Sequence, residues 1–194
     1  MTLTIPGLFV RSNEALAHTV AQISDDQWDL DLPPGLSRLP STLLQAINYH
    51  VWDDAWVPDV LAGKTADEVG DQYETLKALD RSEVLAEYAR YNVRANDAAR
   101  SFDDLDRTVH LSYGDFPAHE YFRHVIAFRA LRAYSVAKLI GADTTLPPDV
   151  VDGLWEHLAP SVESYRAIGI FPAPLAVADD ADPQTKFLAL VGRD

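Results

Sequence analysis

Apolar residues recur at helical spacing along much of this chain, and the pattern predicts a protein built mainly from long helices. Residues 8–24 carry apolar side chains that fall three and four positions apart, which is the spacing of one helix face. Further helices with this spacing are expected over residues 41–63, 82–100, 117–140, 147–167 and 183–191. The segments between them are polar or rich in proline and glycine, which indicates loops.

Residues that start and stop helices mark the expected boundaries. Ser41 is a predicted N-cap, because its hydroxyl can accept a bond from a free amide of the first turn. Gly63 and Gly141 are expected just beyond the ends of two helices, where glycine is common. Pro117 opens a long helix at a position that tolerates proline. Pro58, in contrast, predicts a kink or an early end within its helix.

Several long helices with modest loops favour an antiparallel helical bundle, in which ligand sites lie between facing helices. Residues 106–115 alternate briefly between apolar and polar positions, which predicts a loop or a short strand. Residues 1–167 are expected to form the bundle. Residues 168–194 are expected to form a C-terminal extension packed on it, so that the chain makes a single domain overall.

Composition narrows the classes of function. The 194 residues carry a formal charge of −14, which disfavours nucleic acids and anionic membrane surfaces as partners. The chain has no cysteine, and this excludes disulfides, thiolate catalysis and cysteine-ligated zinc. We see no pattern of a signal peptide and no long apolar run. A cytoplasmic monomer or homodimer with a small-molecule ligand is therefore expected.

His50 is the first residue that could carry chemistry, because it lies on the apolar face of the helix over residues 41–63. It could be a metal ligand, a general base or a hydrogen-bonded histidine of the core. Asp54 follows one turn later and could orient the imidazole by accepting its N–H. Tyr49 and Trp52 flank His50 in the sequence and could form the wall of an apolar pocket.

The helix over residues 117–140 places His124, Phe128 and Arg132 one turn apart on a single face. Phe128 has no lone pair for a metal, and Arg132 is cationic. His50 and His124 alone would make an incomplete metal site. Arg132 in a pocket suits a carboxylate, enolate or phosphate of a ligand, whereas on the surface it would pair with a nearby acidic residue.

Three segments resemble one known family. The run from Asn48 to Trp52, with Leu61, Ala62 and Gly63, resembles the second helix of the DinB and mycothiol-dependent maleylpyruvate isomerase superfamily. Residues 105–117 resemble the family's approach to its third bundle segment. Residues 181–194 resemble the C-terminal end of its actinobacterial metal-binding branch.

The resemblance implies a DinB-like four-helix bundle, with zinc or nickel held by three protein ligands and with mycothiol as the thiol cofactor. One of the three ligands falls on His50. The other two, an acidic residue and a histidine, fall on Phe128 and Arg132, so two of the three ligands are replaced.

Three hypotheses follow. The first is a metal-independent enzyme of the isomerase, cyclase or lyase type, which uses the former metal cleft. Its expected catalytic residues are His50, Asp54 and Arg132, and its expected substrate-binding residues are Tyr49, Trp52, His124, Phe128 and Tyr134. The second is a non-catalytic small-molecule binding or self-protection protein. The third is a thiol-dependent isomerase or S-transferase that holds a divalent metal through His50, His124 and an unidentified carboxylate.

Overall fold

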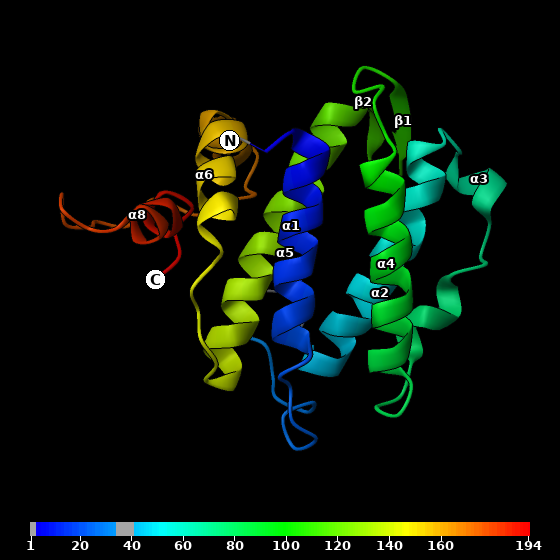
Figure 1. Ribbon diagram of the computed structural model, residues 1–194, viewed down its shortest axis with the longest axis horizontal. Helices are drawn as coiled ribbons and strands as arrows, with labels where there is room; N and C mark the ends of the chain where they lie inside the picture. Colours follow the sequence, from blue (N-terminus) through cyan, green and yellow to red (C-terminus); the bar gives the residue numbers. More distant parts are fainter. Residues whose placement is uncertain (1–2, 34–40) are drawn as a thin grey trace.

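The computed structural model describes residues 3–33 and 41–194, and these residues are mainly helical, as expected (Figure 1). Four long helices lie side by side: α1 (Ile5–Val20), α2 (Leu43–Leu61), α4 (Val84–Arg100) and α5 (Ala118–Ile140). The shorter elements are α3 (Ala66–Val69), the 3-10 helix η1 (Glu74–Ala78), strands β1 (Thr108–Leu111) and β2 (Gly114–Pro117), α6 (Pro148–His157), the 3-10 helix η2 (Ala159–Ser161), α7 (Val162–Ala167) and α8 (Pro183–Leu190).

Local sequence explains where the long helices begin and end. At the start of α2 the cap is Thr42 rather than the predicted Ser41, because Thr42 forms a reciprocal capping box with Gln45. Pro58 does not end α2, since it lies in the last turn and costs only one backbone bond there. Gly141 follows α5 with a φ angle of 73°, the left-handed conformation that glycine adopts readily.

The polar segment after α2 contains short helices that periodicity did not reveal. Thr65 and Glu68 form a second capping box at the start of α3. For the segment over 106–115 the sequence predicted either a loop or a short strand, and the structure shows a strand. It belongs to an antiparallel hairpin in which Val109 pairs with Phe116.

The four long helices form two parallel pairs, so the expected antiparallel arrangement holds only between the pairs. Near the start of α2, the Asn48 side-chain amide donates to the carbonyl oxygen of Leu79, just before α4 begins (2.8 Å). Beyond the end of α4, Arg107 donates to the carbonyl oxygen of Leu61 at the end of α2 (3.1 Å). Helices α2 and α4 therefore run in the same direction. The connection over residues 62–83 returns the chain to the starting end of α2.

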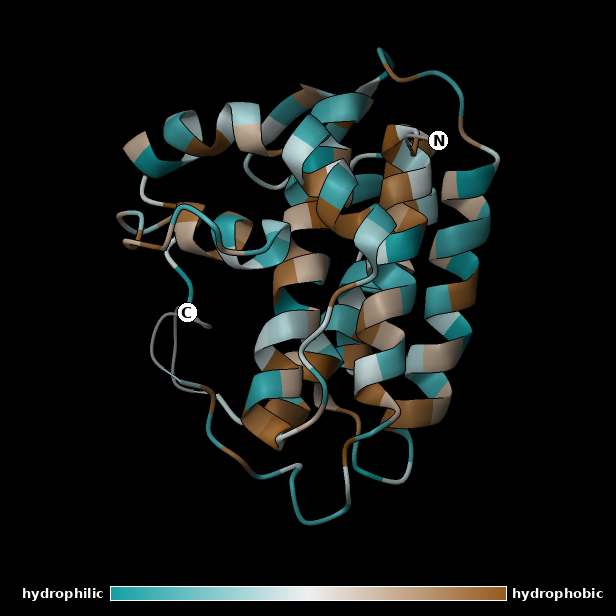
Figure 2. Ribbon diagram, turned by 60° about the vertical axis from the view of Figure 1, so that its left-hand side comes forward, coloured by the Kyte–Doolittle hydropathy of each residue, from teal (hydrophilic) through white to brown (hydrophobic). Residues whose placement is uncertain are grey.

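Helices α1 and α5 also run in the same direction. Gln27, shortly after the end of α1, donates to the carbonyl oxygen of Ile140 at the end of α5 (3.0 Å). The hydrophobic core lies among the four helices, and Figure 2 shows hydrophobic and hydrophilic bands that alternate along them. Phe9 of α1 meets Phe122 of α5 edge to face, with 5.6 Å between ring centroids. No helix of the described residues combines the length and apolar character needed to span a bilayer.

The segment from α6 to the C-terminus packs beside α1 and α5 (Figure 1). The single helix expected over 147–167 is divided into α6, η2 and α7, because Pro160 lacks an amide hydrogen and disfavours helix at the preceding residue. Gly192 has a φ angle of +72°, and an added Cβ would lie 2.4 Å from Cγ of Pro172. This close approach lets the tail return to α5, where the Tyr134 hydroxyl donates to the backbone oxygen of Asp194 (2.8 Å).

Candidate functional site

Helices α2 and α5 meet mainly through long side chains rather than through close backbone packing. His50 of α2 stacks on Phe128 of α5, with ring centroids 4.2 Å apart and ring planes inclined by 21°. Tyr49 meets the same phenyl ring edge to face at 6.0 Å. The Arg132 guanidinium lies 5.5 Å from the centroid of Phe128. The structure thus brings together four of the predicted residues, and we call His50, Tyr49, Phe128 and Arg132 the His50 site.

The imidazole of His50 is buried with unused hydrogen-bonding capacity. The residue is 1% exposed. Neither ring nitrogen has a hydrogen-bond partner among the described residues. Burial, together with the positive charges of Arg132 and Arg129, lowers the pKa of His50 well below its usual value. The ring is therefore neutral near pH 7, and it offers one donor and one acceptor to a ligand.

Asp54 does not orient His50, so that prediction is wrong. One Asp54 oxygen accepts from Nη2 of Arg129 at 2.5 Å and from its Nε at 3.2 Å. The other oxygen accepts weakly from the side-chain amides of Asn13 (3.4 Å) and Asn92 (3.5 Å). Burial raises the pKa of Asp54, and the Arg129 charge opposes this rise. The carboxylate turns to Arg129 because a buried charge needs an opposite charge more than a neutral ring does.

Arg129 is the residue that the sequence analysis missed, and it is the arginine that pairs with the buried Asp54 carboxylate. Its guanidinium is fully buried and also lies 2.8 Å from a carboxylate oxygen of Asp53. Burial lowers the pKa of Arg129, but the charges of Asp54 and Asp53 more than offset this and raise it above its usual value. The signal was present in the sequence: Arg129 lies four residues after Val125, on the apolar stripe of α5.

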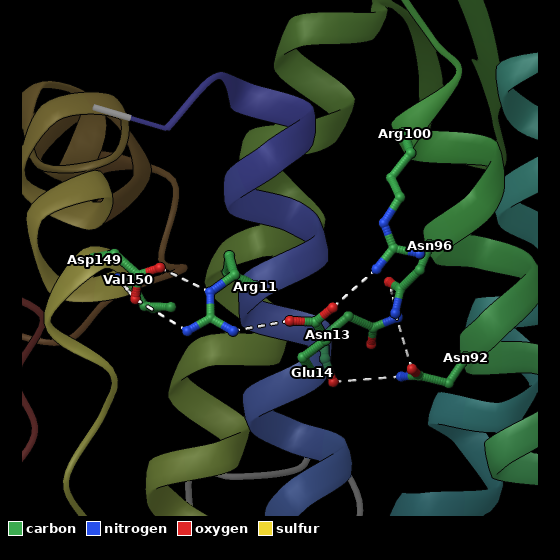
Figure 3. A network of polar contacts seen from close by, with 8 residues as sticks. All are labelled: Arg11, Asn13, Glu14, Asn92, Asn96, Arg100, Asp149 and Val150. Carbon is green, nitrogen blue, oxygen red and sulfur yellow. Dashed lines mark hydrogen bonds and ion pairs between the residues drawn. The ribbon is translucent and has the colours of Figure 1, made fainter. Parts of the chain in front are cut away.

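Three asparagines complete this layer, which we call the buried polar cluster (Asn13, Asp53, Asp54, Asn92, Asn96 and Arg129). The Asn13 amide donates to Asn96 (3.1 Å), Asn96 donates to Asn92 (3.0 Å), and Asn92 donates to the backbone oxygen of Asn13 (3.3 Å), as Figure 3 shows. Nε of Arg129 donates to the Asn13 side-chain oxygen (3.1 Å). Because the polar groups bond one another, the cluster is a structural layer rather than a reactive site.

A chain of surface ion pairs runs outward from the same region (Figure 3). Arg11 binds Asp149 of α6 at 2.7 Å and Glu14 at 2.9 Å, and Glu14 also binds Arg100 of α4 at 2.9 Å. These contacts link α6, α1 and α4. Each is partly exposed, so each contributes less than about 1 kcal/mol.

Arg132 is partly buried on the face of α5 that carries Phe128, outside the buried polar cluster. Burial, assisted by the charge of Arg193, lowers its pKa to about 10. The side chain therefore remains a cation near pH 7. It stands beside the neutral imidazole of His50, whose pKa it helps to lower.

Trp52 and Tyr134 bond residues outside the His50 site. The Trp52 ring contacts Tyr49, but its indole N–H donates to Glu74 (3.2 Å) and its face lies under the Lys77 ammonium at 4.1 Å. Trp52 therefore turns toward η1. Tyr134 bonds the C-terminal tail through its hydroxyl.

His124 belongs to a separate cluster next to the β-hairpin. Its Nδ1 lies 3.2 Å from the Tyr113 hydroxyl and its Nε2 lies 3.3 Å from Glu120. Glu120 also accepts from the Tyr165 hydroxyl (2.6 Å). Burial lowers the pKa of His124, although Glu120 opposes this. No group of three or more histidine, aspartate or glutamate side chains within 3–33 and 41–194 is arranged to hold a metal, so His50 and His124 do not share such a group.

Comparisons with known proteins leave function to be argued from the site. No protein-family model matches this chain, and neither the curated proteins nor the solved structures contain a match. The resemblance to the DinB superfamily therefore stays a prediction.

The buried neutral His50 predicts a loss of stability in mild acid. The folded protein disfavours the imidazolium, whereas an unfolded histidine accepts a proton near pH 6.5. The unfolded state then binds more protons, so the free energy of unfolding should fall as the pH drops below about 6.5, by up to about 1.4 kcal/mol per pH unit. Urea unfolding at several pH values between 7 and 5 measures this slope.

His50→Gln should show a shallower slope than the native chain in the same window. His18→Gln is the matched control, because His18 is exposed at the end of α1. Equal slopes for the native chain and the His50→Gln variant would contradict a neutral His50 in the folded state.

Proposed function

We propose that the protein binds a small, largely apolar molecule carrying a carbonyl or carboxylate at the His50 site, and converts it by metal-independent proton transfer of the isomerase, cyclase or lyase type. The single observation that carries this proposal is the His50 imidazole, which is buried beside a cationic arginine with neither ring nitrogen bonded to a described residue. Buried polar groups are normally hydrogen-bonded. A ligand oxygen would supply the missing partner.

The neighbours of His50 favour an anionic ligand. Protonation of the imidazole would create a third positive charge beside Arg132 and Arg129, which the folded protein opposes. A ligand carboxylate at Arg132 would offset that repulsion and raise the pKa of His50 toward the range useful for a base. His50 is therefore a base suited to an anionic ligand.

The proposed step moves one proton and one electron pair. A C–H bond next to the ligand carbonyl breaks, its proton forms a bond to a ring nitrogen of His50, and the electron pair moves to the carbonyl oxygen. Arg132 would stabilise the resulting enolate. Return of the proton to another carbon completes an isomerisation, and departure of a leaving group on the adjacent carbon completes an elimination.

Access to the imidazole requires movement of the Phe128 ring, because that ring stacks on His50 at 4.2 Å. A change of side-chain rotamer is sufficient for such a movement, and Phe128 is only partly buried. Tyr49 and Phe128 would then form the apolar walls around the ligand.

We also propose a DinB-like scaffold for this site. The contact between His50 on the second long helix and Phe128 on α5 supports the alignment that the resemblance implies. The residues at the two remaining ligand positions do not fit a divalent metal, since a phenyl ring has no lone pair and a guanidinium is a cation. The proposal therefore includes no step through zinc, nickel or mycothiol.

Proton exchange tests the proposal directly. Phenylpyruvate combines an aromatic ring, a carbonyl and a carboxylate, and its exchangeable carbon-bound hydrogens can be followed by NMR in deuterated buffer. The native chain should accelerate the exchange about 100-fold or more over buffer, the usual scale of a positioned general base. His50→Gln should abolish the acceleration while retaining binding.

His18→Gln changes an exposed histidine, and it should accelerate phenylpyruvate exchange as much as the native chain does. Binding that shifts the His50 ring signals without any exchange would support the non-catalytic binding hypothesis and overturn the enzymatic one. The site proposal as a whole fails if phenylpyruvate does not shift the ring signals of His50 and if its binding is unchanged when Arg132 is replaced.

A further inference from the structure

A groove of about 520 Å³ lies between the C-terminal half of α5 and the returning tail. We call it the tail groove, and the lining residues that matter here are Ser135, Leu139, Ile170, Phe171, Val191 and Arg193. Residues 128, 132, 135 and 139 of α5 follow one another at spacings of three and four, so they share one helix face. The tail groove therefore lies on the face of α5 that carries Phe128 and Arg132.

Arg193 brings a partly buried positive charge to this groove. Its guanidinium donates to the Ser135 hydroxyl at 2.7 Å, and that hydroxyl in turn donates to the backbone oxygen of Leu131 at 2.8 Å. Within the described part of the chain, this is the one hydrogen bond of the Arg193 side chain, and no carboxylate pairs with it. A guanidinium has five N–H donors, so most of its donors remain available.

Arg193 lies on the face of α5 that carries Arg132, because its partner Ser135 comes one turn after Arg132. Burial lowers the pKa of both side chains, and the charge of Arg193 contributes to the lowered value of about 10 for Arg132. Two cations in a partly buried position repel each other, and an anion between them would relieve the repulsion. Arginine also matches the planar geometry of a carboxylate.

Lys138 and Asp194 also line the groove and bond each other, since Nζ of Lys138 donates to the backbone oxygen of Asp194 at 2.6 Å. Apolar side chains form much of the remaining groove. Phe171 and Val191 are buried beneath it, and Leu139 is partly buried. Ile170 is 52% exposed, which leaves a large apolar side chain for an occupant to cover. A ligand that covers this surface gains burial of apolar area as well as the ionic contact.

We propose that the tail groove binds the apolar body of an amphipathic carboxylic acid, whose carboxylate lies between Arg193 and Arg132. This inference rests on the proposed function, because Arg132 belongs to both sites. It names the substrate class of the His50 site as an acid with an extended apolar part. The anionic end would lie near the imidazole, and the apolar end would run toward Ile170.

A matched pair of probes tests the charge and the apolar body separately. Decanoate and 1-decanol share the same chain, and only decanoate carries a carboxylate. Calorimetric titration of the full chain should show saturable binding of decanoate, with affinity at least about tenfold above that of 1-decanol. Arg193→Gln should reduce decanoate affinity about tenfold and leave 1-decanol unchanged.

Arg100→Gln is the matched control, because it removes an arginine from the exposed side of α4 far along the chain from the groove. It should bind decanoate like the native chain. Thermal melts of both variants without ligand show whether each is folded. Equal affinity for the acid and the alcohol, or an Arg193→Gln variant that binds decanoate normally, would overturn the inference.

The His50→Gln variant separates this inference from the proposed function. Decanoate binding that needs Arg193 but survives in His50→Gln supports the tail groove, even if phenylpyruvate exchange is never observed. If phenylpyruvate exchange requires His50 but the native chain does not bind decanoate, the tail-groove inference is overturned and the proposed function is not.

Discussion

Replacement of Arg129 by methionine is expected to lower the free energy of unfolding by about 3–5 kcal/mol. The change leaves the buried carboxylate of Asp54 without its only cationic partner among the described residues, and removes the 2.8 Å contact with Asp53. Methionine fills a similar space, so the loss reports the uncompensated charge rather than a cavity. Denaturant unfolding at pH 7 measures it.

Two further variants control for this result. Arg100→Met removes a partly exposed arginine from two surface ion pairs, with Glu14 and Asp97, and should cost less than about 1 kcal/mol. Adding Asp54→Leu to Arg129→Met should restore part of the lost stability, because the second change removes the unpaired charge. A loss in Arg129→Met no larger than that in Arg100→Met would mean that the Arg129 guanidinium is not buried.

The double variant Phe128→Asp, Arg132→His is expected to bind a divalent metal through these two positions and His50. The native chain should bind Zn²⁺ or Ni²⁺ only weakly, because a phenyl ring and a guanidinium offer no ligand. The stacking of His50 on Phe128 at 4.2 Å places position 128 within reach of the imidazole, and position 132 is one turn away. Loss of a single outer-shell partner already changes metal affinity about 10–100-fold, so two added ligands should raise it by more than about 100-fold.

Competition with a chromophoric chelator measures this gain. The control is alanine at both positions, which removes the same side chains without adding ligands. His50→Gln in the metal-binding variant should abolish the gain. If affinity does not rise, the rotational setting of α5 relative to His50, or the alignment implied by the resemblance, is wrong.

The sequence was sufficient to predict most of the long helices, because their boundaries are local. Gly141 ends α5 at the predicted place, and the apolar spacing located α2 and α4 to within a few residues. The direction of α4 relative to α2 was not predictable in the same way, because it depends on the path of residues 62–83. The capping box of Thr65 and Glu68 in that segment was a usable local signal for α3.

The structure brings some of the predicted site residues together for a related reason. Tyr49, His50, Phe128 and Arg132 do lie together, because residues one turn apart share a helix face. The residue that was missed is Arg129, the arginine that enters the core. Successive residues point about 100° apart around a helix, so a small rotation of α5 decides between neighbouring faces. That rotation depends on the buried partners of α5, and these come from other helices.

The three asparagines between α1 and α4 allow these helices only one alignment. Apolar contacts are non-directional, so two helices packed through leucines alone could slide by one turn and still bury apolar side chains on both helices. A slide of one turn, about 5.4 Å, would break the bonds among Asn13, Asn92 and Asn96 and leave buried amides unbonded. Arg129 of α5 bonds the same Asn13. The buried polar cluster therefore also fixes the angle at which α5 presents Phe128 to His50.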